Sequence, residues 1–417
     1  LLFLNSRYLF ICDGIKRRLS YLMEETPLLR FVLYTWGANS YGQLGHGHAE
    51  DEAEPRRADG GLQPEQIRGL TGGGGHSAVI TESGDLLMCG QNHKGQLGLR
   101  HISEVMTFQP CPLPGCRRVQ AVSCGWDFTL ILTDDGQVLA CGSNAFGQLG
   151  ISPHITHTAE PLCVKALSEC VTSVAAGLRH ALARTASACV YQWGTGLSSH
   201  AKRALNPQPV PAHLTSKEPC LVPGLDHVTP EKVVAGSAHC ICLTVTGDVF
   251  LWGSNKHGQL VSDSPFLPLP VALDRSVLQR ERVTDIHSGW THVIAQTESG
   301  RVFTWGRASY GQLGQTVANQ RLEPESERSS NSHAEVKGLF GATQIACGSE
   351  HNLAIVGGRI LSWGWNEHGM CGDGSLCDIT QPQPIPSLQD STTLLIGCGA
   401  GHSMALCSLK SSKDSAS

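Results

Sequence analysis

Short apolar runs separated by polar turns occupy most of this 417-residue chain. Residues 76–90 are an example: the run His-Ser-Ala-Val-Ile-Thr is followed by Glu-Ser-Gly-Asp and then by Leu-Leu-Met-Cys-Gly. Two apolar runs of this length around a glycine turn predict a β-hairpin. The arrangement recurs with glycine turns at 135–136, 246–247, 299–300 and 357–358. We therefore expect a chain built mainly from strands.

One hairpin of the series lacks the glycine. It has Ser187-Ala188 at the turn. Glycine adopts a positive φ at little cost, whereas an L side chain does not. We therefore expect a strained or altered turn in this unit.

Two phrases frame the hairpins, and each occurs seven times. The first is Gly-x-x-His, with Phe128 in place of histidine in one copy; the second is Trp/Cys-Gly-x-Asn-x-x-Gly-Gln-Leu-Gly, of which the copy at Trp193 keeps only Trp-Gly. From the histidine position to the glycine of the next second phrase there are 14 residues in five units and 13 in the sixth. Successive second phrases lie 52 to 59 residues apart. Constant cores joined by variable loops are typical of a repeat architecture.

Strand-rich and glycine-rich units of about 50 residues favour a β-propeller, with a solenoid as the alternative. The two ends of the chain favour a ring. An orphan second phrase at 33–45 precedes the first complete unit, and an orphan first phrase at 394–407 follows the last. Together they would form a seventh unit and leave no free sheet edge. We predict an all-β, seven-bladed β-propeller closed by pairing of N- and C-terminal strands.

Three regions follow from this prediction. Residues 31–407 form the propeller, and residues 408–417 form a polar tail that we expect to be disordered. Residues 1–30 are a non-repeat N-terminal extension. Their apolar stretches are too short for a membrane span, and a segment foreign to the native protein explains them equally well.

The two phrases together resemble the repeat of the regulator of chromosome condensation family, whose members are seven-bladed propellers. The resemblance covers about residues 33–407. The segments 36–45, 124–128, 252–260 and 363–372 are most similar to a branch of this family linked to guanine nucleotide exchange and to control of protein secretion. The resemblance implies a small GTPase as partner, together with proteins of the secretory machinery.

Charge and cysteine content narrow the choice of partner and compartment. The net charge is −5, with 31 basic and 36 acidic residues, so we expect no nucleic-acid partner and no chromatin binding. The 17 cysteines are too few for a disulfide scaffold. Cys89 and Cys141 take the place of tryptophan in the second phrase and are interpreted as small buried apolar residues. We expect a reducing compartment, the cytoplasm and also the nucleus.

The sequence contains no recognisable motif for covalent chemistry. There is no phosphate-binding loop of the form Gly-x4-Gly-Lys-Ser/Thr and no nucleophile elbow, and we expect no cofactor. Cys240 and Cys242 beside His239 are better explained by alternation along one strand than by zinc, so we expect no metal site. A catalytic histidine would occur once, so the six repeated ones are interpreted as structural: His76, His180, His239, His292, His351 and His402.

Function is sought where the units differ. In a propeller, the Gly-x-x-His turns gather at one mouth of the central channel, which would carry Trp126, Asp127, Arg179, Trp290 and Glu350. Tryptophan and arginine are favoured interface anchors. In a chromatin-bound member of the family, residues at this turn position take part in exchange on the Ran GTPase. The resemblance therefore marks Asp127 and Glu350 as candidates.

Asp127 is the preferred catalytic candidate, because its unit also replaces histidine by Phe128. A solvated turn with buried aromatic neighbours is the competing interpretation. Trp365 and Glu367 in the last second phrase are further candidates for partner binding. Two long connections, 202–236 and 314–348, would serve either as partner-binding loops or as tolerated insertions. Exchange on a small GTPase and a non-catalytic scaffold for protein–protein interaction both remain open.

Overall fold

The computed structural model describes residues 29–58, 60–315 and 333–410. Most of the predicted N-terminal extension, residues 1–28, and residues 411–417 of the predicted tail lie outside this range. Residues 408–410 belong to the last strand, which runs from His402 to Lys410. None of the helices within the described ranges is long and apolar enough to cross a membrane.

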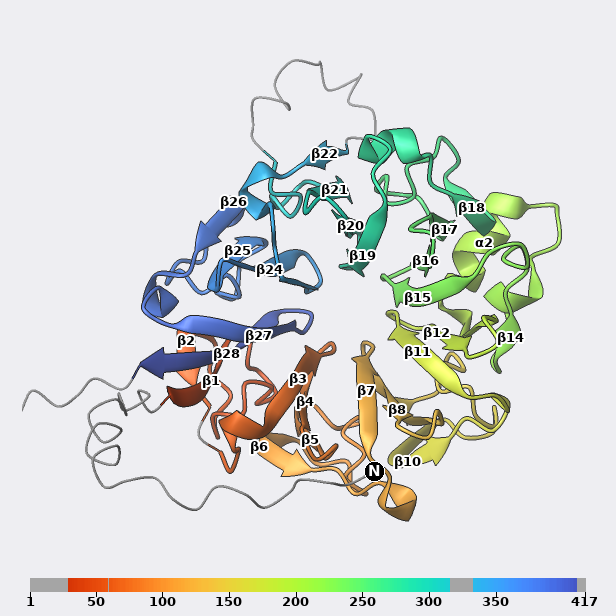
Figure 1. The fold of residues 1–417 in the computed structure, drawn as a ribbon. Coiled ribbons are helices and arrows are strands. Elements are labelled where there is room, and N and C mark those ends of the chain that lie inside the picture. Colours follow the sequence, from red (N-terminus) through yellow and green to blue (C-terminus); the bar gives the residue numbers. More distant parts are fainter. Residues whose placement is uncertain (1–28, 59, 316–332, 411–417) are drawn as a thin grey trace, which may run out of the picture.

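Seven antiparallel sheets of four strands each surround a central channel, as predicted (Figure 1). The innermost strand of each sheet ends in a Gly-x-x-His turn at the channel. From the innermost strand outward, six sheets are β3 (Ile67–Gly72), β4 (His76–Thr81), β5 (Leu86–Gly90), β6 (Val105–Pro110); β7 (Val119–Cys124), β8 (Phe128–Thr133), β9 (Val138–Ser143), β10 (His157–Cys163); β11 (Val171–Ala176), β12 (Ala181–Thr185), β13 (Val190–Trp193), β14 (Cys220–Leu221); β15 (Pro230–Ala235), β16 (His239–Thr244), β17 (Val249–Ser254), β18 (Phe266–Ala272); β19 (Val283–Ser288), β20 (His292–Thr297), β21 (Val302–Gly306), β22 (Ala334–Glu335); and β23 (Gln344–Cys347), β24 (His351–Val356), β25 (Arg359–Gly364), β26 (Ile379–Pro384).

The seventh sheet is built from both ends of the described chain. Its order is β27 (Thr392–Cys398), β28 (His402–Lys410), β1 (Leu29–Gly37) and β2 (Glu52–Arg57). β1 and β28 pair in continuous antiparallel register, from Leu29 opposite Lys410 to Gly37 opposite His402. This pairing confirms the predicted closure of the ring, and it joins segments that are far apart in the sequence.

The second phrase fastens each blade to the blade before it. The Trp36 indole is fully buried, and its Nε1 donates to the Met370 carbonyl at 2.9 Å. Trp305 and Trp363 make the equivalent bonds to the carbonyls of Gln259 and Gln312. Cys89 and Cys141 are buried as predicted and, in addition, their thiols donate weakly to the carbonyls of Gln43 and Gln96 at 3.5 Å.

The glycine of the Gly-x-x-His phrase is required because the histidine ring of the same turn packs directly against it. The Gly348 amide donates to the His351 carbonyl at 2.7 Å, and the His351 ring folds back over the glycine. A Cβ added to Gly348 would lie 2.0 Å from His351 Cε1, far inside van der Waals contact. The recurrence of glycine is therefore a steric requirement of the turn.

The turn without glycine is strained, as predicted. Ala188 has φ of 65°, in the left-handed region, and its amide donates to the Thr185 carbonyl at 2.9 Å. Gly300 makes the same 2.9 Å bond to Thr297 with φ of 86°. The turn at Ala188 therefore has the same geometry as the glycine turns, and the alanine adopts a left-handed conformation that is unfavourable for an L residue.

Replacing Ala188 by glycine should stabilise the protein by about 1 kcal/mol. The left-handed conformation costs an L residue about 1–2 kcal/mol, and the greater freedom of glycine in the unfolded chain offsets part of the gain. Urea unfolding at constant m-value measures the change. Gly300→Ala is the matched reverse change, because the nearest atom to a Cβ there lies 3.6 Å away; it should destabilise by a similar amount. An Ala188→Gly variant no more stable than wild type would contradict the strain.

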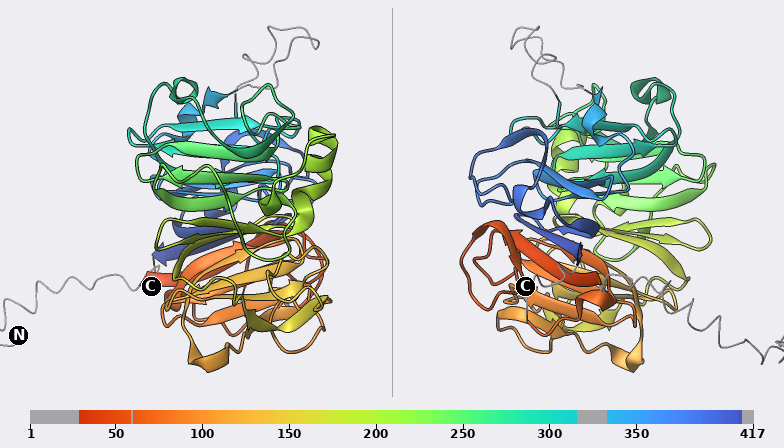
Figure 2. Two further views of the ribbon diagram at one scale, coloured as in Figure 1. Left: turned by 90° about the vertical axis from the view of Figure 1, so that its right-hand side faces the viewer. Right: turned by 60° about the vertical axis from the view of Figure 1, so that its left-hand side comes forward.

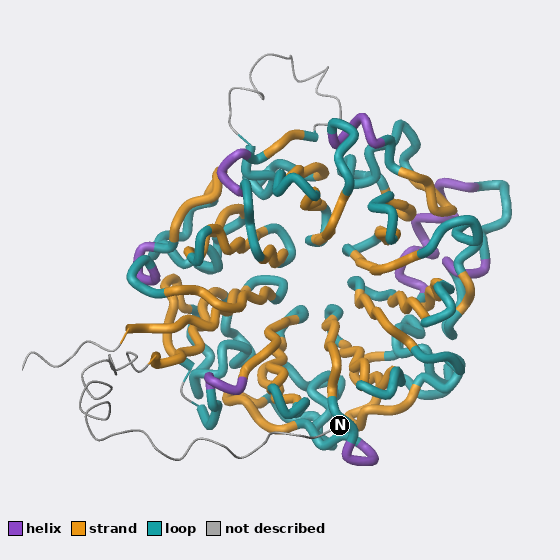
Figure 3. Tube along the Cα trace, in the orientation of Figure 1, coloured by secondary structure: helices purple, strands orange, loops and turns teal. Residues whose placement is uncertain are grey.

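Helical structure lies mainly at the rim, with one exception in the third unit (Figure 3). There the lost Gly-Gln-Leu-Gly is replaced by a 3₁₀ turn, Thr195–Leu197, and the helix α2, Ser198–Leu205. Figure 2 shows α2 standing at one face of the ring. Leu197 and Ala201 of this insertion are fully buried, and so is Leu214, further along the connection. All three belong to the same hydrophobic cluster as Trp252 of the next blade. The first long connection is therefore a packed element of the fold.

Candidate functional site: the mouth of the channel

Two tryptophans from different blades meet at the channel mouth. Trp126 follows β7 and Trp290 follows β19, and their ring centroids lie 5.5 Å apart at an interplanar angle of 57°. Trp126 is 40% exposed. Both side chains border a channel cavity of about 90 Å³ that is otherwise lined largely by the glycines and small residues of the turns. The two rings form an aromatic pair at the channel mouth.

Backbone hydrogen bonds join neighbouring turns into a fixed rim. The Trp290 amide donates to the Ser349 carbonyl at 2.8 Å, and the Ser349 amide donates to Ala400 at 3.0 Å. The Ala400 amide donates in turn to Gly73 at 2.9 Å. Side chains carried by these turns are therefore held on a pre-organised surface.

Asp127 is the more available of the two acidic candidates. It is half-buried beside Trp126, and its Oδ1 accepts one long hydrogen bond, 3.4 Å, from Gln148 Nε2. In the part of the chain that the structure describes, no cation lies within ion-pair distance of it. Phe128, in the histidine position, is completely buried. Asp127 thus retains acceptor capacity for a partner's cation or donor.

Glu350 is held within the protein. Its carboxylate is buried, with the residue 6% exposed, and it accepts hydrogen bonds from Thr291 Oγ1 at 2.7 and 2.8 Å and from Gln312 Nε2 at 2.7 Å. His292 Nδ1 and Arg307 Nη1 lie 3.8 and 4.0 Å from it. The structure gives Glu350 a clear structural role as a link between blades.

The remaining candidates, Arg179, Trp365 and Glu367, form two separate groups. The Arg179 guanidinium lies over the Phe146 ring, 4.5 Å from its centroid. Trp365 contacts Tyr310 and His368, at centroid distances of 6.2 and 5.7 Å. Glu367, two residues after Trp365 in the chain, is exposed. The structure therefore brings Trp126 and Trp290 together, with Asp127 next to Trp126 in the chain, whereas Arg179 and Trp365 make their contacts with other residues.

All six repeated histidines are completely buried, and most of them bridge blades. Nε2 of His76, His292, His351 and His402 bonds the side chain of the residue that follows the histidine position in the next blade, at 2.6 to 3.0 Å. His239 bonds Ser288 Oγ at 2.8 Å instead. Burial lowers the pKa of His76, His239, His351 and His402 to about 3 and that of His180 to about 4. These rings are neutral at physiological pH.

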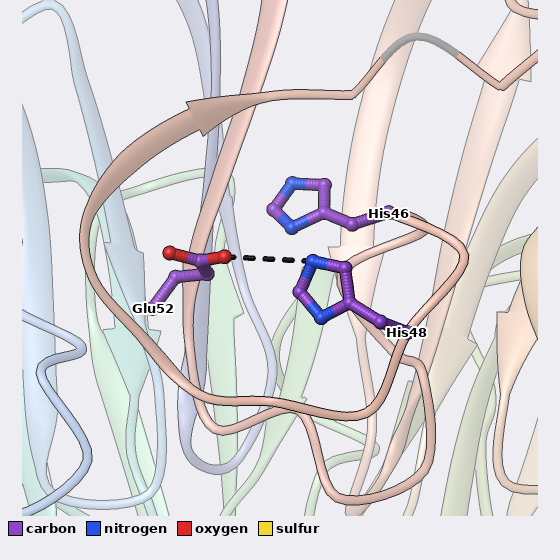
Figure 4. Close-up of side chains that lie close together, drawn as sticks. All are labelled: His46, His48 and Glu52. Atoms are coloured by element: carbon purple, nitrogen blue, oxygen red, sulfur yellow. Dashed lines mark ion pairs between the residues drawn. The ribbon is translucent and has the colours of Figure 1, made fainter.

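A histidine pair that sequence reasoning missed lies in the loop between β1 and β2. His46, His48 and Glu52 bring one potential metal-ligand atom each within 4.8 Å of one another (Figure 4). The Glu50 amide donates to His48 Nδ1 at 3.2 Å, which leaves the proton of the neutral ring on Nε2. His48 Nε2 lies 3.5 Å from Glu52, so this proton faces the carboxylate. His46 Nδ1 and His48 Nε2 are buried and make no hydrogen bond. The spacing His-x-His would have revealed this cluster from the sequence.

Comparison with known proteins defines the family. A family model described as the RCC1-like domain matches residues 32–405. The chain belongs to this family. It is 53% identical over 389 residues to the secretion-regulating guanine nucleotide exchange factor of Bos taurus, covering 91% of this chain and 83% of that protein. To the protein of the same name from Mus musculus it is 51% identical over 398 residues, covering 93% and 86%.

A solved structure supports the architecture of the RCC1-like domain seen here. Prp20p from Saccharomyces cerevisiae, described with its binding properties to Gsp1p and histones, has a TM-score of 0.79 against this chain. The two are 23% identical, and the match covers 93% of each chain. At this identity the likeness concerns the fold.

Proposed function

We propose that this RCC1-like domain protein is a guanine nucleotide exchange factor for a small GTPase, and that the channel mouth around Asp127 contacts the GTPase. The observation that carries the proposal is the combination of an available carboxylate with an aromatic anchor on a rigid rim, in a chain more than 50% identical to proteins named as exchange factors. The link of those relatives to secretion suggests partners in the secretory machinery. The cytoplasm and the nucleus are the compartments that we propose; fifteen cysteines are free in the structure, and free thiols are typical of proteins in a reducing compartment.

An exchange factor forms and breaks no covalent bonds. A small GTPase holds its nucleotide through a phosphate-binding loop, a lysine and Mg²⁺. A protein that binds the empty GTPase more tightly than the loaded one must weaken nucleotide binding by the same factor. A 10⁵-fold weakening corresponds to about 7 kcal/mol of coupling. A rigid ring suits this task because it does not yield when it displaces flexible segments of its partner.

Asp127 would act by charge. A carboxylate brought to the nucleotide site can pair with the phosphate-binding lysine and disfavour the phosphates that this lysine normally holds. Trp126 and Trp290 would anchor the partner beside it, since buried aromatic residues dominate interface energetics. Glu350 would not contact the partner, because its carboxylate already accepts hydrogen bonds from Thr291 and Gln312. Its role would be to hold neighbouring turns of the channel mouth in place.

Asp127→Ala should lower the acceleration of nucleotide release by about 10- to 100-fold, the effect of removing 1–3 kcal/mol of coupling. Release of fluorescent GDP from purified small GTPases measures it. Asp134→Ala is the matched control, because Asp134 is exposed at the opposite end of the same strand, β8. Equal exchange by both variants would rule out the role of Asp127.

The alternative, a scaffold without exchange activity, predicts a different nucleotide dependence of binding. Purified protein would be used to capture GTPases from cytosol, once with GTP and Mg²⁺ and once with a chelator. An exchange factor should retain its GTPase mainly in chelator, where the empty form prevails. Capture of a GTPase only with GTP and Mg²⁺, or of other proteins under both conditions, would favour the scaffold.

A further inference from the structure

A second cavity lies beside the channel mouth, where α2 meets the neighbouring turns. Its volume is about 670 Å³, within the range of small-molecule sites. The turns at Leu178-Arg179 and Ser237-Ala238 form one part of its wall, and the inserted segment around α2 forms another. The segment that replaces Gly-Gln-Leu-Gly in the third unit therefore supplies part of the lining of this cavity.

The wall of this cavity is fixed by backbone contacts. The Thr195 amide donates to the Phe146 carbonyl at 2.8 Å, and the Gly196 amide donates to the Arg179 carbonyl at 3.2 Å. A Cβ on Gly196 would come within 2.8 Å of that carbonyl oxygen, so the insertion packs directly on the Arg179 turn. Phe146 in turn supports the Arg179 guanidinium. Arg179 is exposed, and this contact places its guanidinium over the Phe146 ring at the edge of the cavity.

The charged side chains that line the cavity are of one sign. Arg179, Lys202 and Lys256 line it together with His200 and His257, and no aspartate or glutamate is among the lining residues. Within the described ranges, none of the three cations has a carboxylate partner within 4 Å. This concentration of uncompensated positive charge occurs in a chain whose net charge is −5. Such a concave site attracts anions.

The polar groups between the cations are hydroxyls. Thr195, Ser198, Ser199, Thr215 and Ser254 line the cavity, and they can both donate and accept hydrogen bonds. Burial lowers the pKa of His200, and the nearby Arg203 and Lys256 lower it further. His200 Nδ1 is buried without a hydrogen-bond partner. A residue with an unpaired imidazole nitrogen thus lines the same cavity as the three cations.

We propose that this cavity binds a small ligand carrying two or more phosphate groups. Phosphate oxygens accept hydrogen bonds from arginine, lysine and hydroxyls, and several phosphates are needed to neutralise three separated cations. An acidic peptide fits less well, because the apolar lining is limited to Phe146, Leu178 and Ala238 and offers few pockets for side chains. The proposal is independent of the exchange activity proposed above.

The test measures binding of inositol hexakisphosphate to the full chain by calorimetry at about 0.15 M salt. Lys256→Glu and Lys202→Glu should each weaken binding at least tenfold, since a hydrogen bond to a charged group contributes about 1.5–3 kcal/mol. Arg203→Glu is the matched control: it makes the same change of charge on the same helix, but Arg203 does not line the cavity. It should change the affinity less than about threefold.

Other results would overturn the proposal or identify the source of the phosphates. Equal weakening by Lys202→Glu and Arg203→Glu would mean diffuse attraction to the whole face and no site. Binding of a polyglutamate peptide in preference to the inositol phosphate would replace the proposal by a peptide groove. If vesicles containing a phosphoinositide bind more tightly than the soluble compound, with the same dependence on Lys256, the ligand is a lipid headgroup; if not, it is a free phosphorylated molecule.

Discussion

Lowering the pH from 7 to about 5 should unfold the propeller. The folded-state pKa values of His76, His239, His351 and His402, about 3, lie well below the value of about 6.5 for an unfolded histidine. Between these values the unfolded chain binds more protons than the folded one, so stability is complete above pH 6.5 and falls as the pH falls.

The expected size of this effect is large. Each buried histidine costs about 1.4 kcal/mol per pH unit below 6.5, so these four and His180, whose pKa is about 4, together remove about 7 kcal/mol at pH 5.5. A typical domain has 5–15 kcal/mol in total. Circular dichroism or intrinsic fluorescence followed against pH should therefore show a steep transition between pH 5 and 6, with uptake of several protons.

His180→Phe provides the control for acid unfolding. Neither ring nitrogen of His180 has a side-chain partner, and a phenylalanine already occupies the equivalent position at Phe128. The variant should fold at neutral pH, take up about one proton fewer on unfolding and shift the transition to lower pH. A wild-type protein that keeps its native spectrum at pH 4 would show that the buried histidines do not control acid stability.

Truncation after Gly401 should abolish the closed ring. It removes β28, which lies between β1 and β27 and carries the buried residues Met404, Ala405, Leu406 and Cys407. Both neighbouring strands would then expose unpaired edges, which promote aggregation. Size-exclusion chromatography should show aggregates, and thermal melting should lose its cooperative transition.

Removal of residues 411–417 is the matched control for this truncation. These residues follow the last strand, so the shortened protein should remain monodisperse and melt like the full chain. A soluble, cooperatively melting protein that ends at Gly401 would argue that the seventh sheet is not needed to close the ring.

The repeated phrases were sufficient to predict the architecture. Because the period and the split seventh unit are explicit in the sequence, they specify the number of blades and the pairing of β1 with β28. The strain at Ala188 was also predictable, since the requirement for a positive φ is local to one turn. These features depend on residues that are close in the sequence or that repeat at a constant spacing.

The candidate site was less accessible to sequence reasoning. Asp127 and Glu350 look equivalent in their turns, but the partners of Glu350, Thr291 and Gln312, come from the preceding unit. The basic cavity brings together Arg179, Lys202 and Lys256, which share no motif. The eight residues of α2 are too few for their periodicity to predict a helix beside the lost phrase.

The closure of the ring also affects how the protein folds during its synthesis. Gly37 pairs with His402, 365 residues further along the chain. At 5–20 residues per second, a ribosome needs about 20 to 75 s to synthesise that length. Throughout this interval β1, with Phe31, Val32 and Leu33, lacks the partner strand that completes its blade. The nascent protein must therefore keep an apolar strand from pairing wrongly until its last blade emerges, which makes it a natural client for chaperones that act during translation.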